Sequence, residues 1–331
     1  ASSDEREQAW KGSKGVGREV EPELKQLVKL RNQAAQKLGF RDYYVLSLYL
    51  NEQDEGALLA LFAQLDELTL GPFLELKASL DKTLAKRLKI APAQLRPWHY
   101  HDLFFQEAPK VEGLDLDKLY TGKDILKISR AYYAGLGLPV DDVLERSDLY
   151  EKDGKSPHAF CTDIDREGDV RVLANIRPND YWMNTLLHEL GHAVYSTYVD
   201  RQLPYQLRSE AHILTTEGVA MMFGRVNKRV GWLEQSLGLQ RSRASRVAAE
   251  LRRALRAESL VFSRWCQVML HFERALYANP EADLSRQWWD LVEKYQGLRR
   301  PENRAEPDYA SKIHLVSAPV YYHNYMMGEL F

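Results

Sequence analysis

The feature that most constrains this chain is His188-Glu189-Leu190-Gly191-His192, which has the pattern H-E-x-x-H within an apolar segment. Residues four apart share one face of a helix, so a helix here would let both histidines bind a single metal ion. Glu189 could then reach a water molecule at the metal without binding the metal itself. This arrangement is typical of a zinc peptidase in which the glutamate acts as general base.

Apolar residues surround the motif and cover much of the circumference of the expected helix, which predicts that the helix is buried. They are Met183, Leu186, Leu187, Leu190, Ala193 and Val194. The alternative is a surface helix that carries two solvated histidines, and the apolar flanks disfavour it. Two buried histidines around a glutamate need polar partners, and a metal ion would supply them.

A catalytic zinc ion binds three protein ligands and keeps one position open. Glu217 lies 25 residues after His192, at the start of a second apolar segment. A carboxylate from a second helix packed beside the first would complete a set of two histidines and one glutamate. Glu210 and His212 are rival ligands nearby. Taken alone, Glu217 is an ordinary acid near a helix N-terminus, where the helix dipole favours it.

Length and charge exclude some classes of function. The chain has 331 residues and a net charge of −2, and this balance argues against a nucleic-acid partner bound through its phosphates. Glu250 and Glu258 interleave with the arginines of the segment 241–256, which is interpreted as a solvated helix face. We expect no membrane span, because no apolar run approaches about 20 residues. The two cysteines, Cys161 and Cys266, leave a single disulfide open.

Periodicity predicts a mainly α-helical fold. Helical spacing of leucines dominates residues 1–90, and helical patterns return at 117–147 and 181–297. Residues 148–178 differ, because two short apolar runs flank a turn-rich segment. They predict a β-hairpin or small sheet immediately before the H-E-x-x-H helix.

A second group of chemically useful residues lies between Lys312 and Tyr325. Tyr322 and Tyr325 are three apart, so on a helix they could point into one cleft. Neutral donors can stabilise the oxyanion that forms during peptide hydrolysis, at about 3 kcal/mol for one good donor. The alternative is that these tyrosines pack in the core or at an interface.

Together these segments resemble the angiotensin-converting-enzyme-like zinc peptidases and, more distantly, the thimet oligopeptidase and oligoendopeptidase F group. All are gluzincins, in which a downstream glutamate completes H-E-x-x-H. The resemblance is most specific at His158-Ala159, from His188 to Glu217, and from Lys312 to Tyr325. It implies a deep cleft between two helical lobes, with the small sheet beside the zinc helix.

The resemblance implies one peptidase catalytic domain, incomplete at one or both ends of the chain. We expect a helical lobe over 1–147, a small sheet over 148–178, and zinc- and substrate-binding helices over 179–331. A periplasmic or secreted location is implied, with a cytoplasmic one as the alternative.

The resemblance also implies a role for individual residues. One zinc ion (Zn2+) would be bound by His188, His192 and Glu217, while Glu189 would act as base and then as acid. The remaining roles concern the substrate, whose backbone would pair with an edge strand at His158-Ala159. His158 and His314 would donate to substrate carbonyls, Tyr325 would stabilise the oxyanion, and Lys312, Tyr322 and Gln106 would bind the C-terminal carboxylate.

Three departures from the family pattern change these expectations. Met221 stands where an aspartate supports a zinc-binding histidine, so the groups around the ligands must differ. Asn324 stands where the family has a chloride-binding arginine, so chloride activation is not expected. A small gap leaves Tyr321 and Tyr322 as alternatives for one tyrosine position.

The expected function is zinc-dependent hydrolysis of short peptides with release of C-terminal dipeptides. Two alternatives stay open. One is an endo-acting oligopeptidase that does not need a free C-terminus. The other is a catalytically silent peptide-binding protein on the same fold.

Overall fold

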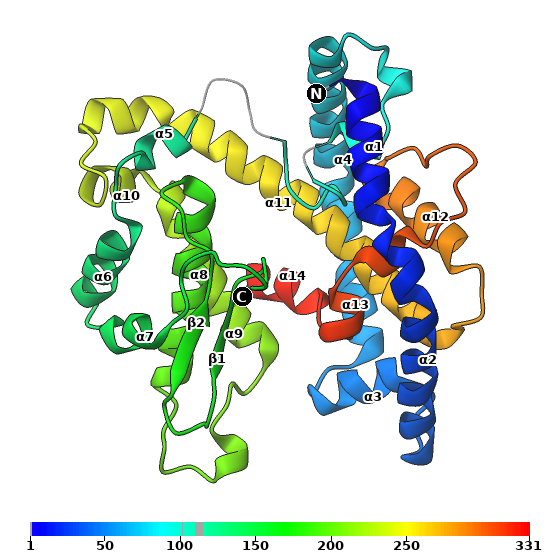
Figure 1. The fold of residues 1–331 in the computed structure, drawn as a ribbon, viewed down its shortest axis with the longest axis horizontal. Coiled ribbons are helices and arrows are strands. Elements are labelled where there is room, and N and C mark those ends of the chain that lie inside the picture. Colours follow the sequence, from blue (N-terminus) through cyan, green and yellow to red (C-terminus); the bar gives the residue numbers. More distant parts are fainter. Residues whose placement is uncertain (1, 101, 110–114) are drawn as a thin grey trace. The chain divides into compact units, whose positions relative to one another are not determined.

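The computed structural model of the chain describes residues 2–100, 102–109 and 115–331 and is mostly helical (Figure 1). The expected mainly α-helical fold with one small sheet is confirmed. The elements in chain order are α1 (Ser3–Lys14), α2 (Val16–Lys37), α3 (Tyr43–Leu50), α4 (Glu55–Leu88), α5 (Asp117–Tyr120), α6 (Ile125–Gly135), α7 (Asp141–Arg146), β1 (Phe160–Asp163), β2 (Val170–Leu173), α8 (Asp180–Thr197), α9 (Ile213–Gly224), α10 (Val230–Gln235), α11 (Arg241–Ala278), α12 (Leu284–Gln296), α13 (His314–Ser317) and α14 (His323–Leu330).

The chain forms two compact units. Unit 1 contains Ala1–Lys110 and Arg256–Met326, and unit 2 contains Val111–Leu255 and Met327–Phe331. Helices α11 and α14 each contribute residues to both units. The units therefore group the chain differently from the three segments expected from the sequence, because residues 115–147 belong with the H-E-x-x-H helix.

In unit 2, the central helix is α8, which begins where the Asn179 side chain accepts a hydrogen bond from the backbone N–H of Trp182. This is a standard N-cap. The apolar positions predicted from the sequence are all buried, and they are Met183, Leu186, Leu187, Leu190, Ala193 and Val194. The Tyr133 hydroxyl on α6 donates to the Leu187 carbonyl at 2.7 Å, which ties α6 to α8.

The sheet is smaller than expected. β1 pairs antiparallel with β2 in the register Phe160 to Leu173. The prediction that the strand includes His158 and Ala159 is wrong, because the ladder begins at Phe160. Both residues lie in the segment that leads into β1, where the Ser156 hydroxyl accepts the His158 backbone N–H at 3.2 Å. This local side-chain bond competes with strand pairing.

Helices α8 and α9 pack with their backbones very close together (Figure 1). A Cβ atom added to Gly191 would lie 2.8 Å from the Ala220 Cα. On the opposite side of α9, a Cβ on Gly328 would lie 2.8 Å from the Gly218 nitrogen and 3.2 Å from the Glu217 Cβ. Since such approaches are too short for a carbon side chain, glycine sets the spacing of the helices that carry the H-E-x-x-H motif and Glu217.

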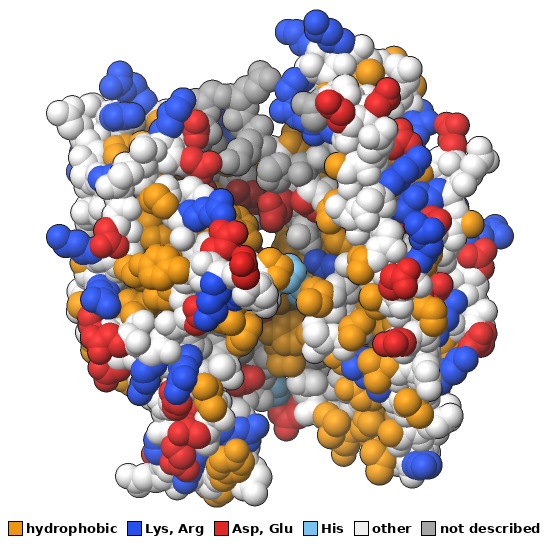
Figure 2. Space-filling model, in the orientation of Figure 1, with side chains coloured by type: hydrophobic (Ala, Val, Ile, Leu, Met, Phe, Trp, Pro, Cys, Tyr) orange, Lys and Arg blue, Asp and Glu red, His pale blue; other side chains and the backbone are white. Residues whose placement is uncertain are grey.

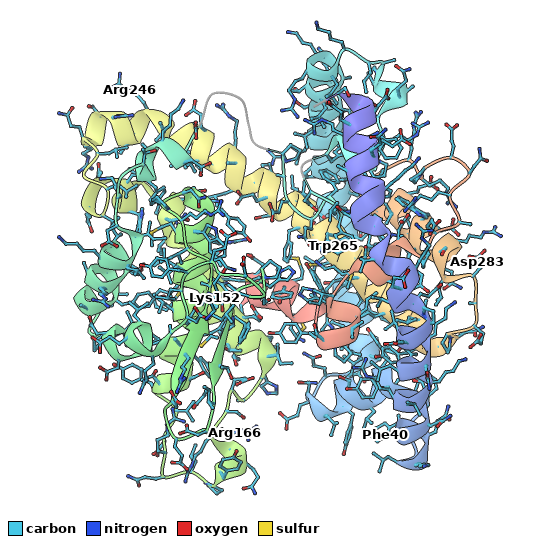
Figure 3. The ribbon with its side chains drawn as sticks, viewed as in Figure 1. Phe40, Lys152, Arg166, Arg246, Trp265 and Asp283 are labelled. Atoms are coloured by element: carbon cyan, nitrogen blue, oxygen red, sulfur yellow. The ribbon has the colours of Figure 1, made fainter. Side chains whose placement is uncertain are left out.

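Unit 1 is built around aromatic side chains on α11, α12 and the preceding loops. Trp265 on α11, labelled in Figure 3, is fully buried. Its ring lies edge-on to Trp288 at 5.8 Å and to Tyr322 at 5.7 Å between ring centroids. Such edge-to-face contacts are favourable beyond the area that they bury. They place Tyr322, a predicted substrate-binding residue, directly against the core of unit 1.

One helix departs from the expectation that no segment could cross a membrane. Among the described residues, α4 is long and apolar enough to do so by length and composition. Leu58, Phe62 and Phe73 on α4 are buried within the protein, whereas Leu68 and Leu74 are exposed. Length and composition alone do not establish a span, and a single such helix is weak support for one.

Charged side chains are interspersed over the face drawn in Figure 2. On α11, Arg241, Arg243 and Arg246 are exposed, and Arg246 points outward in Figure 3. The solvated helix face predicted from the sequence is therefore present. Cys161 and Cys266 are both free thiols, so the disulfide that the sequence left open does not form.

Candidate metal and carboxylate sites

His188, His192 and Glu217 meet at one point of unit 2. The His188 Nε2 and His192 Nε2 atoms are 3.2 Å apart, and they lie 3.6 Å and 3.7 Å from Glu217 Oε2. Zinc bonds to nitrogen and oxygen at tetrahedral angles would hold such atoms roughly 3.3–3.5 Å apart. The donor set and its spacing therefore fit a zinc ion.

The rival ligands Glu210 and His212 do not join this group. Among the residues that the structure describes, the set whose ligand atoms all lie within 4.8 Å of one another consists of His188, His192 and Glu217. His212 instead takes the N-cap position of α9, and the Thr215 hydroxyl donates to its carbonyl at 2.7 Å.

Burial keeps both histidines in the form that binds metal. It lowers the pKa of His188 to about 3, with a smaller effect from His192, and it lowers the pKa of His192 to about 4. Both imidazoles are thus neutral at pH 7, with lone pairs free for a cation. The Glu217 carboxylate is 2% exposed, so the site offers one negative charge in a poorly solvated place, where a divalent cation would be strongly favoured.

Thr216 is a further residue at the site that the sequence did not reveal. Its Oγ1 lies 2.7 Å from His192 Nδ1. With Nε2 turned toward Glu217, Nδ1 is left to donate its proton to the threonine hydroxyl, which fixes the tautomer and the ring orientation. Met221 stands where the family pattern has a supporting aspartate, and here a neutral hydroxyl one residue before Glu217 contacts the histidine instead.

Glu189 is also buried at the motif. Burial raises its pKa to about 8, and the negative charge of Glu217 adds to the shift. A cation bound at the cluster would lower the pKa of Glu189 again. Because Glu189 lies on α8 between the two histidines, the helix itself sets its position beside the cluster.

β1 presents one free edge. It is paired with β2 along one side, and no described strand pairs with its other side. Phe160 and Thr162 alternate with Cys161 along it, and the exposed His158 lies two residues before its start. An open strand edge can bind an extended peptide through main-chain hydrogen bonds.

Unit 1 brings together the three residues predicted to bind a carboxylate. The Lys312 ammonium donates to Gln106 Oε1 at 2.7 Å, and the Tyr322 hydroxyl donates to the same oxygen at 3.4 Å. Among the described residues, no carboxylate lies within ion-pair distance of Lys312. Burial lowers the pKa of Lys312 to about 8, so the ammonium stays largely charged at pH 7.

Aromatic rings enclose this ammonium. Lys312 Nζ lies 5.1 Å from the centroid of the Phe104 ring, 5.3 Å from that of Trp265 and 5.2 Å from that of Tyr322. Ring faces attract a cation, particularly where water is excluded. They hold the charge in place without neutralising it, so it can still bind an anion.

The loop that carries Gln106 is shaped by Asp102. The Asp102 carboxylate accepts the backbone N–H groups of Phe104, Gln106 and Glu107 at 2.8, 3.2 and 2.9 Å. Phe105 adopts a left-handed conformation with φ of 51°, and the Gln296 amide donates to its carbonyl at 2.8 Å. These bonds satisfy the polar backbone groups of a loop that has no regular structure, and they fix the backbone that carries Gln106.

His314 and Tyr325 also lie together in unit 1. The His314 ring is 6.1 Å from that of Tyr325 and 4.9 Å from that of Tyr322. Tyr321 and Tyr322 lie 5.2 and 5.1 Å from Tyr325. These tyrosines therefore also pack against one another, as the alternative interpretation predicted. The Tyr322 hydroxyl bonds to Gln106, a contact that favours Tyr322 over Tyr321 for the carboxylate-binding position.

The predicted site residues are therefore divided between the two units. His188, Glu189, His192, Glu217, His158 and Ala159 belong to unit 2, whereas Gln106, Lys312, His314, Tyr322 and Tyr325 belong to unit 1.

Comparison with known proteins identifies relatives of this chain. A family model for peptidase family M2, described as angiotensin-converting enzyme, matches residues 98–331, well over half of the chain. Angiotensin-converting enzyme of Rattus norvegicus is 23% identical over an alignment that covers 95% of this chain and 26% of the relative. The angiotensin-converting enzyme-like protein Ace3 of Mus musculus is 23% identical, covering 97% of this chain and 47% of the relative.

Angiotensin-converting enzyme of the fly Haematobia irritans exigua is 27% identical over 68% of this chain and 38% of the relative. The chain thus spans between about a quarter and a half of the length of these relatives.

Proposed function

Because the chain belongs to the angiotensin-converting enzyme family of peptidases, we propose that it is a zinc-dependent peptidyl-dipeptidase. It removes dipeptides from the C-terminus of short peptides. The family supports the peptidase class, and the cluster of His188, His192 and Glu217 supports zinc as the metal.

The observation that carries the proposal for a free C-terminus is the environment of Lys312. A buried charge is costly unless it is paired, and the described groups that touch this ammonium are a neutral amide and aromatic rings. The carboxylates of Asp102 and Glu107 attract the ammonium without touching it, and a substrate carboxylate would supply an opposite charge in direct contact. Gln106 and Tyr322 would then donate to the same carboxylate, so one cation and two neutral donors would recognise it.

The protein's own groups would act on the peptide as follows. A bound zinc ion would polarise the scissile carbonyl and make water more acidic. The Glu189 carboxylate takes a proton from the attacking water and later delivers it to the leaving amine. His314 and Tyr325 donate hydrogen bonds to the oxygen that becomes negative. The edge of β1, with His158 and Ala159 before it, aligns the peptide backbone.

The experiment compares one short peptide as a free acid and as a C-terminal amide, with products identified by mass spectrometry. Wild type, Glu189→Gln and a chelator-treated sample are run in parallel. We expect release of a C-terminal dipeptide from the free acid alone, abolished by Glu189→Gln and by the chelator.

Other outcomes would change the assignment. Internal cleavage of both peptides at equal rates would make the protein an endo-acting oligopeptidase and remove the role of Lys312. Absence of cleavage by protein with one zinc ion bound would favour a catalytically silent peptide-binding protein.

A further inference from the structure

The segment between Lys312 and Tyr325 is irregular, and buried side chains from other parts of unit 1 hold it. Arg31 on α2 donates to the Val316 carbonyl at 3.0 Å. The Glu273 carboxylate on α11 accepts the Val320 backbone N–H at 2.8 Å. Val320 has a φ of 55°, a costly conformation for a β-branched residue, which must be held by its surroundings.

A third anchor lies immediately before Tyr325. Gln53 Oε1 lies 2.6 Å from His323 Nε2, and the Gln53 amide nitrogen donates to Asn324 Oδ1 at 2.6 Å. The Asn324 amide nitrogen in turn donates to the Tyr321 carbonyl at 3.0 Å. One amide therefore connects two consecutive residues and, through Asn324, the turn that precedes them. We call this group the Gln53 clamp.

Within the clamp, His323 and Asn324 are buried, Gln53 is half-buried, and the protonation of His323 is fixed. His323 is 1% exposed and Asn324 is 0% exposed. Burial lowers the pKa of His323 to about 3, so the ring is neutral and its Nε2 proton donates to Gln53 Oε1. The orientation of the Gln53 amide is thereby determined, because its oxygen accepts from His323 and its nitrogen donates to Asn324. Removing it would leave buried polar groups unsatisfied, which is costly.

The chain places Gln53 there by a short strained turn. Gln53 lies between α3 and α4, after Glu52, whose φ is 54°, and before the α4 N-cap Asp54. Its own backbone N–H donates to the Leu48 carbonyl at 2.8 Å. A non-glycine residue in the left-handed region is uncommon and is retained where the surroundings require it.

We propose that Gln53 is a positioning residue, which orients the Tyr325 hydroxyl through His323 and Asn324. Helix α14 begins at His323, so Tyr325 lies in its first turn. A helix advances about 100° per residue, and the clamp fixes both the rotation and the start of that turn. This inference rests on the proposed function, in which Tyr325 donates to the developing oxyanion.

The kinetic test is a double-mutant cycle with Gln53→Met and Tyr325→Phe on a free-acid peptide. Methionine has a similar shape but can make neither bond. We expect Gln53→Met to lower kcat roughly ten- to a hundredfold in the Tyr325 background, since small misplacements of a reacting group have effects of this size. In the Tyr325→Phe background, it should change kcat less than twofold. KM and zinc content should stay at wild-type values, and Gln64→Met on the exposed face of α4 is the control.

Gln53→Glu separates positioning from folding. A glutamate can accept from His323 but cannot donate to Asn324 Oδ1, so it should show an intermediate loss of kcat with a cooperative thermal transition. This variant replaces Gln53→Met if the latter does not fold. An equal loss in both Tyr325 backgrounds, or unchanged kcat in a folded Gln53 variant, would overturn the proposal.

A measurement without turnover distinguishes this inference from the proposed function. Protein that carries 3-fluorotyrosine at position 325 should give one narrow 19F resonance, and the Gln53 variants should broaden or split it. If no peptide is cleaved, the function fails while this readout still decides whether Gln53 orients Tyr325. An unchanged resonance in both Gln53 variants would refute the proposal that Gln53 orients Tyr325.

Discussion

The metal cluster (His188, His192 and Glu217) and the carboxylate cluster (Gln106, Lys312 and Tyr322) are assembled in different ways. His188, His192 and Glu217 come from two neighbouring helices whose backbones touch, so helix geometry and glycines set their spacing. Lys312 and Gln106 are 206 positions apart in the chain and lie outside helices. Their positions depend on individual bonds such as those that Asp102 accepts.

This difference separates two kinds of defect. A change in the metal cluster should slow the cleavage of every peptide, because it acts on the reaction itself. A change in the carboxylate cluster should slow only peptides with a free C-terminus, because it acts on recognition. The ratio of rates for free-acid and amide peptides therefore reports which cluster is affected.

The largest effect is expected for Glu189→Gln. Loss of a general base lowers kcat by about 10²- to 10⁴-fold, and the loss should be the same for any residual amide cleavage. Stopped assays with zinc content determined by mass spectrometry would test this. If the variant has less metal than wild type, or if its loss of activity differs between the two peptides, the two clusters do not have separate effects on reaction and recognition.

Lys312→Met should act on recognition alone. Loss of one partner of a buried charge pair is expected to lower kcat/KM for the free acid roughly a hundredfold. Cleavage of the amide, if measurable, should not change, and the exposed Lys82→Met provides a matched control. A proportional loss on both peptides would show that Lys312 serves the fold rather than the substrate.

Thr216→Val should weaken metal binding roughly tenfold, at the lower end of what loss of a group behind a metal ligand does. The reason is that His192 Nδ1 loses its partner at 2.7 Å. Competition with a fluorescent zinc chelator would measure the affinity. Thr215→Val, on the same helix, removes a hydroxyl that faces Tyr195 and His212, and it should bind zinc as wild type does.

The smallest expected effect is a pH dependence specific to the carboxylate cluster. Burial lowers the pKa of Lys312 to about 8, so its charge is present below that pH and is lost as pH rises through it. The free-acid to amide ratio of kcat/KM should fall about fourfold between pH 7 and pH 8.5. The ratio cancels ionisations that both peptides share, and Lys312→Met should abolish the dependence.

The same contrast explains what the sequence could predict. The period of α8 and the four-residue spacing of His188 and His192 were sufficient to predict a buried helix that brings both histidines to one point. Glu217 followed because its helix comes next in the chain. Thr216 could not be predicted, because nothing local indicates which side of α9 faces His192.

The carboxylate cluster could not be predicted from a local sequence pattern. Gln106 was identified by resemblance to a family, since a loop residue 206 positions from its partner leaves no periodic pattern. The Gln53 clamp was missed for the same reason. The exact start of β1 was missed because the Ser156 hydroxyl binds the backbone just before it.

The close approach of α9 to its neighbours has a consequence for protein engineering. The ligand spacing is set where backbones meet at Gly191, Gly218 and Gly328, and a Cβ on Gly224 would lie 3.3 Å from the Cβ of His188. A designer who grafted only the two histidines and the glutamate onto another helix pair would obtain a cage of the wrong size. The transferable unit is the three ligands together with the four glycines.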